Sequence, residues 1–232
     1  LQQLGPFSPD PRSTDPMRFF QAWPASIRFA DINVRWFDDR SALPGLSLSE
    51  RVNHELKLDR PIAELRAMYS ENHRRSLKKA AKALVVVDDR PGLDEIIAFL
   101  EESEQFKRWN IGKADRAAMH RILRVAEASG NGFGKAVRNG GELVAAAYFV
   151  RWGDRVIFLK GLSSAEGREL RAMHAIIDRT IADHAGKDLF FDLAGGNEEQ
   201  LARFYAGFGA ERVLYLRALM NRLPPLIRRM KM

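Results

Sequence analysis

The sequence predicts an α/β fold in which strands and helices follow one another along most of the chain. From Leu84 onward, segments with apolar residues at every second position are succeeded by segments with apolar residues at every third or fourth position. Glycines stand between many of these segments, as expected where the backbone turns sharply. A chain of 232 residues with 46% hydrophobic residues can bury a substantial core. We therefore expect one large globular domain or two small ones.

Residues 1–60 carry few elements of their own. The patterns predict a short helix at 17–23, a strand at 26–37, a loop at 38–48 and a short strand at 54–58. Three elements over this length make a poor independent core. The chain also opens with Leu1 rather than methionine, so we expect that an N-terminal segment is missing and that residues 1–60 are the remnant of a neighbouring domain.

The next element is a basic helix, predicted from about Pro61, which suits a first helical turn, to Ala83. No acidic residue occurs from Asn72 to Val87, whereas one helix face collects five cations: Arg74, Arg75, Lys78, Lys79 and Lys82. Such a face suits a phosphate ligand, and the alternative is an ordinary solvated helix surface. The net charge of +7 fits either interpretation.

The elements expected beyond residue 83 follow from the same patterns. In chain order they are a strand at 84–89, helices at 91–106 and 114–130, strands at 132–140, 142–152 and 155–163, a helix at 167–184, a strand at 187–196, a helix at 201–208 and a strand at 211–219. Asn139, Gly140 and Gly141 form the turn of a hairpin between two of these strands.

The helix at 201–208 carries a tyrosine on its apolar face. Its stripe, which recurs at helical spacing and should face a core, consists of Leu201, Phe204, Tyr205 and Phe208. Gly209 follows where a left-handed C-terminal cap is favoured, so the helix is expected to end near Phe208.

Composition excludes several classes of function. The chain has no cysteine, which excludes disulfides, thiolate nucleophiles and cysteine metal sites, and its five histidines form no metal-binding pair such as H-E-x-x-H. We therefore expect no metal. No apolar run reaches the roughly 18 residues that a membrane-spanning helix needs, and the first residues do not resemble a secretory signal. The expected compartment is the cytoplasm.

Three stretches resemble the FemAB-like branch of the GNAT acyltransferase superfamily, including the domains known as BioF2-like acetyltransferases. They are YSENHRRSLKKAAK at 69–82, LFFDLAGGNEEQLARFYAGFGAERV at 189–213 and LMNRLP at 219–224. The resemblance covers about residues 61–226 and implies a FemAB-like GNAT domain at 61–232. Because FemAB-like proteins often contain two such domains in tandem, residues 1–60 resemble the C-terminal part of a first GNAT-like domain.

The resemblance implies one mixed sheet over residues 84–221, with helices on both faces. Its two central strands, at 155–163 and 187–196, should splay apart and admit an acyl donor, either an acyl-CoA or an aminoacyl-tRNA. The unpaired backbone groups of splayed strands can hold an amide-rich arm such as pantetheine. Side chains are absent where this ligand would approach the backbone, at Gly161, Gly195 and Gly196.

Tyr205 and Asp192 are the candidate catalytic residues. Tyr205 matches the helix position at which many GNAT enzymes place a tyrosine as general acid, and the ordinary tyrosine pKa of about 10 keeps its hydroxyl protonated. The alternative is a core tyrosine with its hydroxyl at the rim. Asp192 lies within a hydrophobic strand, where a carboxylate is costly unless it is paired or faces a ligand cleft.

The loop that would hold the donor's phosphates departs from the family pattern. Coenzyme A–dependent GNAT enzymes usually bind the pyrophosphate on a glycine-containing loop that opens the helix after the long central strand. Here the loop SSAEGRELRA retains Gly167, with Arg168 beside it, but Glu166 and Glu169 would repel a phosphate. Either the donor is not coenzyme A, as in Fem-type enzymes that use aminoacyl-tRNA, or this site has drifted.

Two functions are consistent with these features. The first is an N-acyltransferase that transfers an acetyl or aminoacyl group to an amine, with a phosphate-bearing substrate, such as a cell-wall precursor or tRNA, bound by Arg74, Arg75 and Lys78. The alternative is a non-catalytic GNAT-like module that binds nucleic acid or another polyanion through the basic helix. Salt-dependent polyanion binding without donor binding would identify the module.

Overall fold

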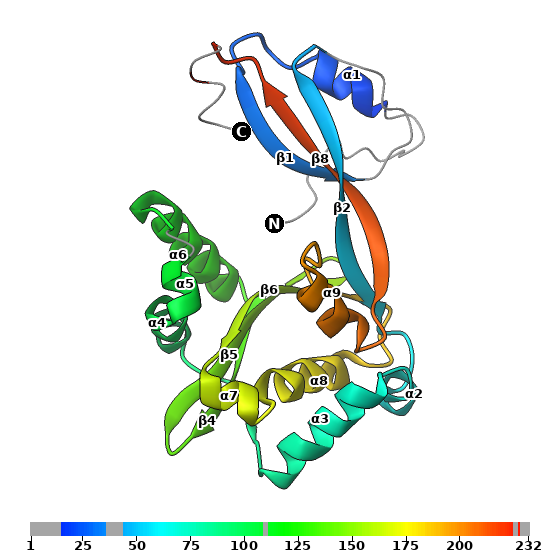
Figure 1. Cartoon of the computed structure of the whole chain (residues 1–232), viewed down its shortest axis with the longest axis vertical. Coiled ribbons are helices and arrows are strands. Elements are labelled where there is room, and N and C mark those ends of the chain that lie inside the picture. Colours follow the sequence, from blue (N-terminus) through cyan, green and yellow to red (C-terminus); the bar gives the residue numbers. More distant parts are fainter. Residues whose placement is uncertain (1–14, 36–43, 109–110, 225–226, 228–232) are drawn as a thin grey trace. The chain divides into compact units, whose positions relative to one another are not determined.

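The structure is a computed structural model that describes residues 15–35, 44–108, 111–224 and 227 (Figure 1). Residues 1–14, and residues 38–43 within the expected loop, lie outside this described part. The chain divides into two compact units, one formed by Leu1–Asn53 with Arg212–Met232 and the other by His54–Glu211. Each unit has a core of its own.

The described strands form a single mixed sheet. In chain order they are β1 (Phe29–Arg35), β2 (Leu46–Lys57), β3 (Val87–Asp88), β4 (Gly132–Asn139), β5 (Glu142–Trp152), β6 (Arg155–Ser163), β7 (Phe190–Asp192) and β8 (Glu211–Asn221). Their hydrogen-bonded order is β1-β8-β2-β7-β6-β5-β4-β3, in which β6 and β7 run parallel while β5 is antiparallel to both of its neighbours. The predicted mixed sheet is confirmed, and it extends beyond residues 84–221 to include β1 and β2.

The described helices are α1 (Pro16–Gln21), α2 (Ile62–Ala67), α3 (Glu71–Lys82), α4 (Leu93–Glu102), α5 (Glu104–Arg108), α6 (Lys113–Ala128), α7 (Ala165–Glu169), α8 (Ala172–His184) and α9 (Glu199–Ala206). None of these described helices combines the length and the apolar character needed to cross a lipid bilayer.

Helices cover both faces of the sheet in the unit formed by His54–Glu211, as predicted. Consecutive residues of a strand point to opposite faces, and β5 shows this directly. Phe149 lies in one core with Ile177 of α8 and Phe208 beyond α9, whereas the adjacent Tyr148 lies in a second core with Leu123 of α6. The two cores sandwich the sheet.

The unit formed by Leu1–Asn53 and Arg212–Met232 has a small core. Phe20 of α1, Val34 of β1 and Leu216 of β8 are buried together. The division between the units falls after residues 53 and 211, whereas the sequence placed a boundary between residues 60 and 61. That residues 1–60 are the C-terminal part of a first GNAT-like domain stays a prediction.

β6 and β7 pair over three residues and then separate. Their ladder ends where Ile157 lies opposite Asp192, although β6 continues to Ser163. The strand expected at 187–196 is therefore shorter than predicted. It ends because the Asp192 carboxylate accepts a hydrogen bond from the Ala194 N–H at 2.8 Å, and Ala194 adopts a left-handed φ of +52°. The predicted splay of the two central strands is confirmed.

Two predicted helices are each divided in two. The basic helix expected at 61–83 breaks after α2, because Ser70 caps α3 by accepting a hydrogen bond from the His73 N–H at 3.3 Å. The helix expected at 167–184 starts earlier, as α7, and breaks at Arg171, which has a left-handed φ of +59°. Apolar periodicity does not register such breaks, because the stripe continues across them.

Two other predicted elements are also shorter than expected. The strand at 84–89 is reduced to β3, since Leu84 has a left-handed φ of +53°. The helix at 91–106 is interrupted between α4 and α5 at Ser103, whose backbone is extended.

A buried lysine joins β4 to α8. The Lys135 side chain is 4% exposed, and its ammonium contacts the carboxylates of Asp89 and Asp183, the latter at 2.7 Å. Arg179 contacts the same two carboxylates at 2.8 and 3.1 Å but is half exposed. Because a buried charge is tolerated only when it is paired, this cluster constrains how α8 lies against β4.

We expect Lys135→Ala to lower the free energy of unfolding by about 3 kcal/mol, because it removes the buried partner of two carboxylates. Arg179→Ala is the matched control, since it removes an exposed cation from the same carboxylates and should cost less than about 1 kcal/mol. Urea denaturation followed by circular dichroism measures both losses. Equal losses would contradict the special weight given to the buried lysine.

Candidate active site

The separation of β6 and β7 leaves a cavity, here called the β6–β7 cleft. It has a volume of about 520 Å³ and is lined by β6, by the segment after β7 and by residues of α7, α8 and α9. Three of the predicted site residues meet on its surface: Gly161, Arg168 and Tyr205. Among the described residues, the lining does not include Asp192, Gly167, Gly195 or Gly196.

Tyr205 is buried, and its hydroxyl makes no hydrogen bond within the described part of the chain. The residue is 4% exposed and borders the β6–β7 cleft. Burial, followed by the negative charges of Asp192 and Glu198, raises the pKa of the phenol well above its usual range. Tyr205 therefore presents a protonated hydroxyl to the cleft.

The two most deeply buried tyrosines of the chain, unlike Tyr205, have hydrogen-bond partners for their hydroxyls. Tyr69 donates a hydrogen bond to Asp178 at 3.1 Å, and Tyr148 donates to the Leu123 carbonyl at 3.2 Å. Buried polar groups in proteins are nearly always paired in this way. The hydroxyl of Tyr205 is the exception among these three, because it has no such partner among the described residues, and the residue borders the β6–β7 cleft.

Asp192 is held by groups of the protein itself. Its carboxylate accepts hydrogen bonds from the Arg155 guanidinium at 3.3 Å and from the Ala194 N–H at 2.8 Å, and Arg155 also pairs with Glu55 at 2.8 Å. The carboxylate acts on the cleft through its charge, which helps to keep Tyr205 protonated. The catalytic role predicted for Asp192 stays a prediction.

Two of the predicted glycines, Gly161 and Gly196, are needed for close packing. A Cβ on Gly161 would lie 2.6 Å from the Phe158 ring, so this ring packs directly on the strand. Gly196 has a left-handed φ of +130°, and a Cβ there would lie 2.2 Å from the His54 ring. The same histidine donates a hydrogen bond from Nδ1 to the Gly195 carbonyl at 3.1 Å. His54, which the sequence did not single out, thus holds this glycine pair in place.

The loop predicted to bind the donor's phosphates is held by its own hydrogen bonds. The Gly167 N–H donates to the Ser164 hydroxyl at 3.1 Å, and Arg168 donates to the Ser163 carbonyl at 2.9 Å. A Cβ on Gly167 would lie 2.0 Å from the Val144 carbonyl oxygen, so packing of α7 on β5 requires a glycine. Arg168 is the cation of this loop that lines the cleft.

Two charged residues on the cleft lining were not predicted. Lys160 precedes Gly161 on β6, and desolvation lowers its pKa to about 8. The sequence could have indicated Lys160 as a site residue, because this lysine interrupts an apolar strand just as Asp192 does. Glu198, the only carboxylate on the lining among the described residues, comes from a polar loop and gives no such signal. Within the same described residues, no three His, Asp or Glu side chains gather closely enough to hold a metal ion.

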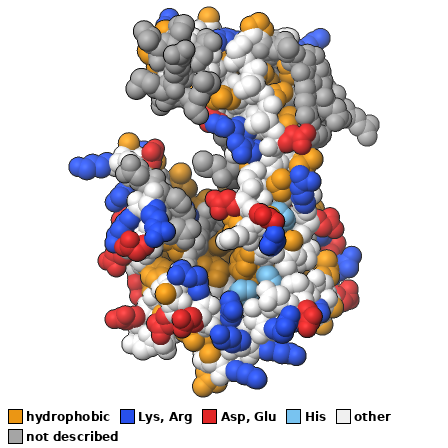
Figure 2. Space-filling model, viewed as in Figure 1, with side chains coloured by type: hydrophobic (Ala, Val, Ile, Leu, Met, Phe, Trp, Pro, Cys, Tyr) orange, Lys and Arg blue, Asp and Glu red, His pale blue; other side chains and the backbone are white. Residues whose placement is uncertain are grey.

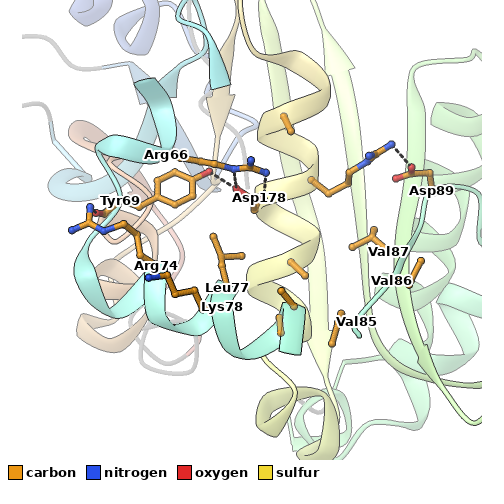
Figure 3. A pocket seen from close by; sticks show the side chains of 15 residues that line it. Arg66, Tyr69, Arg74, Leu77, Lys78, Val85, Val86, Val87, Asp89 and Asp178 are labelled. Carbon is orange, nitrogen blue, oxygen red and sulfur yellow. Dashed lines mark hydrogen bonds and ion pairs between the residues drawn. The ribbon is translucent and has the colours of Figure 1, made fainter. Parts of the chain in front are cut away.

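The cations of the predicted basic face separate into two groups. In the space-filling view, Lys and Arg side chains gather where α3 runs (Figure 2). Arg74 and Lys78 line a second cavity, of about 760 Å³ (Figure 3), whereas Arg75 lies outside its lining and forms an exposed pair with Glu71 at 3.7 Å. This cavity and the β6–β7 cleft share no lining residue. The phosphate-binding role predicted for Arg74, Arg75 and Lys78 stays a prediction.

Residues 67–204 match the family model of the acetyltransferase (GNAT) domain. This match covers more than half of the chain and includes the whole lining of the β6–β7 cleft except Tyr205. No curated protein matches the chain at a significant level.

Several solved structures share the fold. FemX has a TM-score of 0.61 at 13% identity, over 88% of this chain and 75% of that chain. A conserved protein of unknown function from Bacteroides thetaiotaomicron has a TM-score of 0.56 at 12% identity, over 76% and 62%. The C-terminal domain of a protein described as a lysylphosphatidylglycerol synthetase from Agrobacterium fabrum has a TM-score of 0.50 at 10% identity, over 81% and 65%. This chain spans less than two thirds of the last two, and the similarity is one of fold.

We expect Gly167→Ala to lower the free energy of unfolding by about 1–3 kcal/mol, because the added methyl group collides with a backbone carbonyl that cannot move freely. Gly112→Ala is the control: Gly112 lies just before α6, and the nearest atom to its Cβ is 3.8 Å away, so stability should hardly change. Urea denaturation measures both variants. A fully stable Gly167→Ala variant would contradict the packing role.

We expect Lys160 to react with amine reagents at lower pH in the folded chain than in the unfolded chain, because burial favours its neutral amine. Trace acetylation with acetic anhydride, mapped by peptide mass spectrometry across a pH series, should give a midpoint at about pH 8 when folded and near 10.5 in urea. The same midpoint in both states would show that Lys160 is not desolvated.

Proposed function

Because this chain belongs to the family of acetyltransferase (GNAT) domains and is therefore an acyltransferase, we propose that it transfers an acyl group from an activated ester or thioester to an amine. The donor is an acyl-CoA or an aminoacyl-tRNA, whose acyl end would enter the β6–β7 cleft. A phosphate-bearing amine, such as a cell-wall precursor, suits the basic surface of α3 as the acceptor and would be met in the cytoplasm.

The hydroxyl of Tyr205 is the observation that carries this proposal. No fully buried side-chain oxygen or nitrogen of the described residues lacks a hydrogen-bond partner. The Tyr205 hydroxyl has no partner among these residues, so it is accessible from the cleft, where a ligand can complete its hydrogen bonding. The cleft exists because two neighbouring strands separate, which leaves backbone N–H and C=O groups for the donor's amide-rich arm. Arg168, at the cleft surface, supplies a positive charge for the donor's phosphates.

In the proposed reaction the amine nitrogen attacks the acyl carbon, and the bond from that carbon to the leaving sulfur or oxygen breaks. Tyr205 donates its proton to the leaving atom, which would otherwise depart as a thiolate or an alkoxide. The surplus proton of the amine passes to Glu198, the carboxylate on the cleft lining. Exchange with water then restores both side chains. Asp192 acts through Tyr205, because its charge keeps the phenol protonated until negative charge develops on the leaving atom and draws the proton away.

We expect Tyr205→Phe to lower kcat by about 10²-fold or more with little change in donor affinity, since it removes a proton donor and keeps the ring. Phe204→Leu is a control from the same helix and the same lining, because it changes packing without removing a proton donor.

Asp192→Asn should shift the alkaline limit of the pH–rate profile downward, since it removes a charge that keeps the phenol protonated. Free thiol release from acetyl-CoA and deacylation of aminoacyl-tRNA, each with a panel of amines, provide the rates.

Two results would reject this assignment. A Tyr205→Phe variant with an unchanged rate would remove Tyr205 from catalysis while leaving acyl transfer itself in place. If neither donor binds to the folded chain and oligonucleotides bind with a steep dependence on salt, the chain is the polyanion-binding module considered as the alternative.

A further inference from the structure

A second cavity lies over α8, apart from the lining of the β6–β7 cleft. It is bordered by α3 on one side and by the segment at 85–89 on the other, and its volume is about 760 Å³ (Figure 3). We call it the α8 groove. Acyl transfer within the β6–β7 cleft does not use it, although two residues of the α3 surface proposed for the acceptor's phosphate, Arg74 and Lys78, lie on its lining.

Much of the α8 groove is apolar. The apolar lining consists of Leu77, Ala80, Ala81, Val85, Val86, Val87, Ala175 and Ala182. Val86 is 76% exposed, and Leu84, just before this segment, is 85% exposed. Leu84 has a φ of +53°, which is strained for a leucine, so the chain holds these side chains in water at a cost. Exposed apolar surface that is rimmed by charged residues is typical of a binding site.

Two of the cations on the rim are neutralised by carboxylates of the groove. Arg66 forms a two-bond pair with Asp178, at 2.9 Å from Nε and 2.6 Å from Nη2. Arg179 pairs with Asp89 at 2.8 Å. These pairs leave no net charge to attract a ligand.

Arg74 and Lys78 are the cations of the groove that remain. One terminal nitrogen of Arg74 donates to the backbone carbonyls of Ala67 and Tyr69, which fixes the position of the guanidinium. Lys78 lies one turn further along the same ridge of α3. Neither has a carboxylate partner among the described residues. The groove therefore combines an apolar floor with two unneutralised positive charges on its α3 side.

We propose that the α8 groove binds an anionic amphiphile, with a phosphate headgroup at Arg74 and Lys78 and an alkyl chain over the alanines and valines. The fork of an arginine can hold two phosphate oxygens, and the lysine adds a point charge. Burial of the chain would cover the exposed valines, which a free phosphate would leave in water. A nucleic acid would instead be held by Arg75, Lys79 and Lys82, which lie outside the apolar lining of the groove.

The probe is dodecyl phosphate, titrated into the full chain below its micelle-forming concentration and followed by calorimetry. Inorganic phosphate and dodecyltrimethylammonium are the comparison ligands. The first has the phosphate group without the alkyl chain, and the second has the alkyl chain with a positive headgroup. We expect dodecyl phosphate to bind at least about tenfold more tightly than inorganic phosphate, because chain burial adds to the ionic contact. Dodecyltrimethylammonium should not bind, because the free charges of the groove repel it.

Paired variants separate the groove from the rest of the basic helix. Arg74→Glu with Lys78→Glu should weaken dodecyl phosphate binding by about tenfold or more, because both headgroup contacts are lost. Lys79→Glu with Lys82→Glu makes the same change in net charge outside the groove and should weaken it by less than about threefold. Ala182→Phe fills the floor without a change of charge and should also weaken binding. Circular dichroism confirms that each variant is folded.

Three outcomes would overturn the proposal. Equal weakening by the two charge-reversal pairs would mean general attraction to a basic surface. Equal affinity for inorganic phosphate and dodecyl phosphate would remove the apolar part of the site. An oligonucleotide that binds more tightly than dodecyl phosphate and depends on Lys79 and Lys82 would assign the helix to nucleic acid. Each outcome leaves acyl transfer in the β6–β7 cleft standing, because the groove and the cleft share no lining residue, and would change only the contact proposed between the acceptor and α3.

Discussion

The early end of β7 is the constraint on which the candidate active site depends. The Asp192 carboxylate turns back to the Ala194 N–H, and the ladder with β6 stops at that point. Arg155 binds both Asp192 and Glu55, which lie opposite each other on β7 and β2. Three adjacent strands are therefore tied together at the base of the splay, and beyond it β6 continues beside β5 without β7. A longer ladder would close the space that a donor needs.

The cleft concentrates groups that would be unfavourable in an ordinary core. Tyr205 keeps a hydroxyl without a partner among the described residues, and Lys160 loses part of its hydration, which lowers its pKa to about 8. Stable proteins tolerate a few such local conflicts, most often where a ligand resolves them. Lys135, which is also desolvated, pairs with two carboxylates. The cleft therefore presents a protonated hydroxyl and a partly desolvated amine to a ligand.

The sequence predicted the strands at 142–152 and 155–163 with their observed bounds, because long apolar alternation between turn residues has few other solutions. It placed Tyr205 on the buried face of α9 for a similar reason. It did not predict the breaks at Ser70 and Arg171, since a capping hydroxyl and a left-handed backbone interrupt a helix without altering its apolar stripe. Apolar periodicity predicts which face of a helix is buried, but it does not predict where the helical backbone breaks.

The sequence by itself determined the order of the elements and the presence of a basic helix, because these follow from local periodicity and charge. Its resemblance to FemAB-like proteins implied the mixed sheet with helices on both faces. Only the tertiary structure decided which of those charges act together. Arg74 and Arg75 are neighbours in the chain, yet one lines the α8 groove and the other pairs with Glu71 outside it. Successive helical residues point about 100° apart, and what each meets depends on the elements packed beside the helix. Packing also decided the relation between Asp192 and Tyr205. The charge of Asp192 raises the pKa of Tyr205, although only Tyr205 lines the cleft.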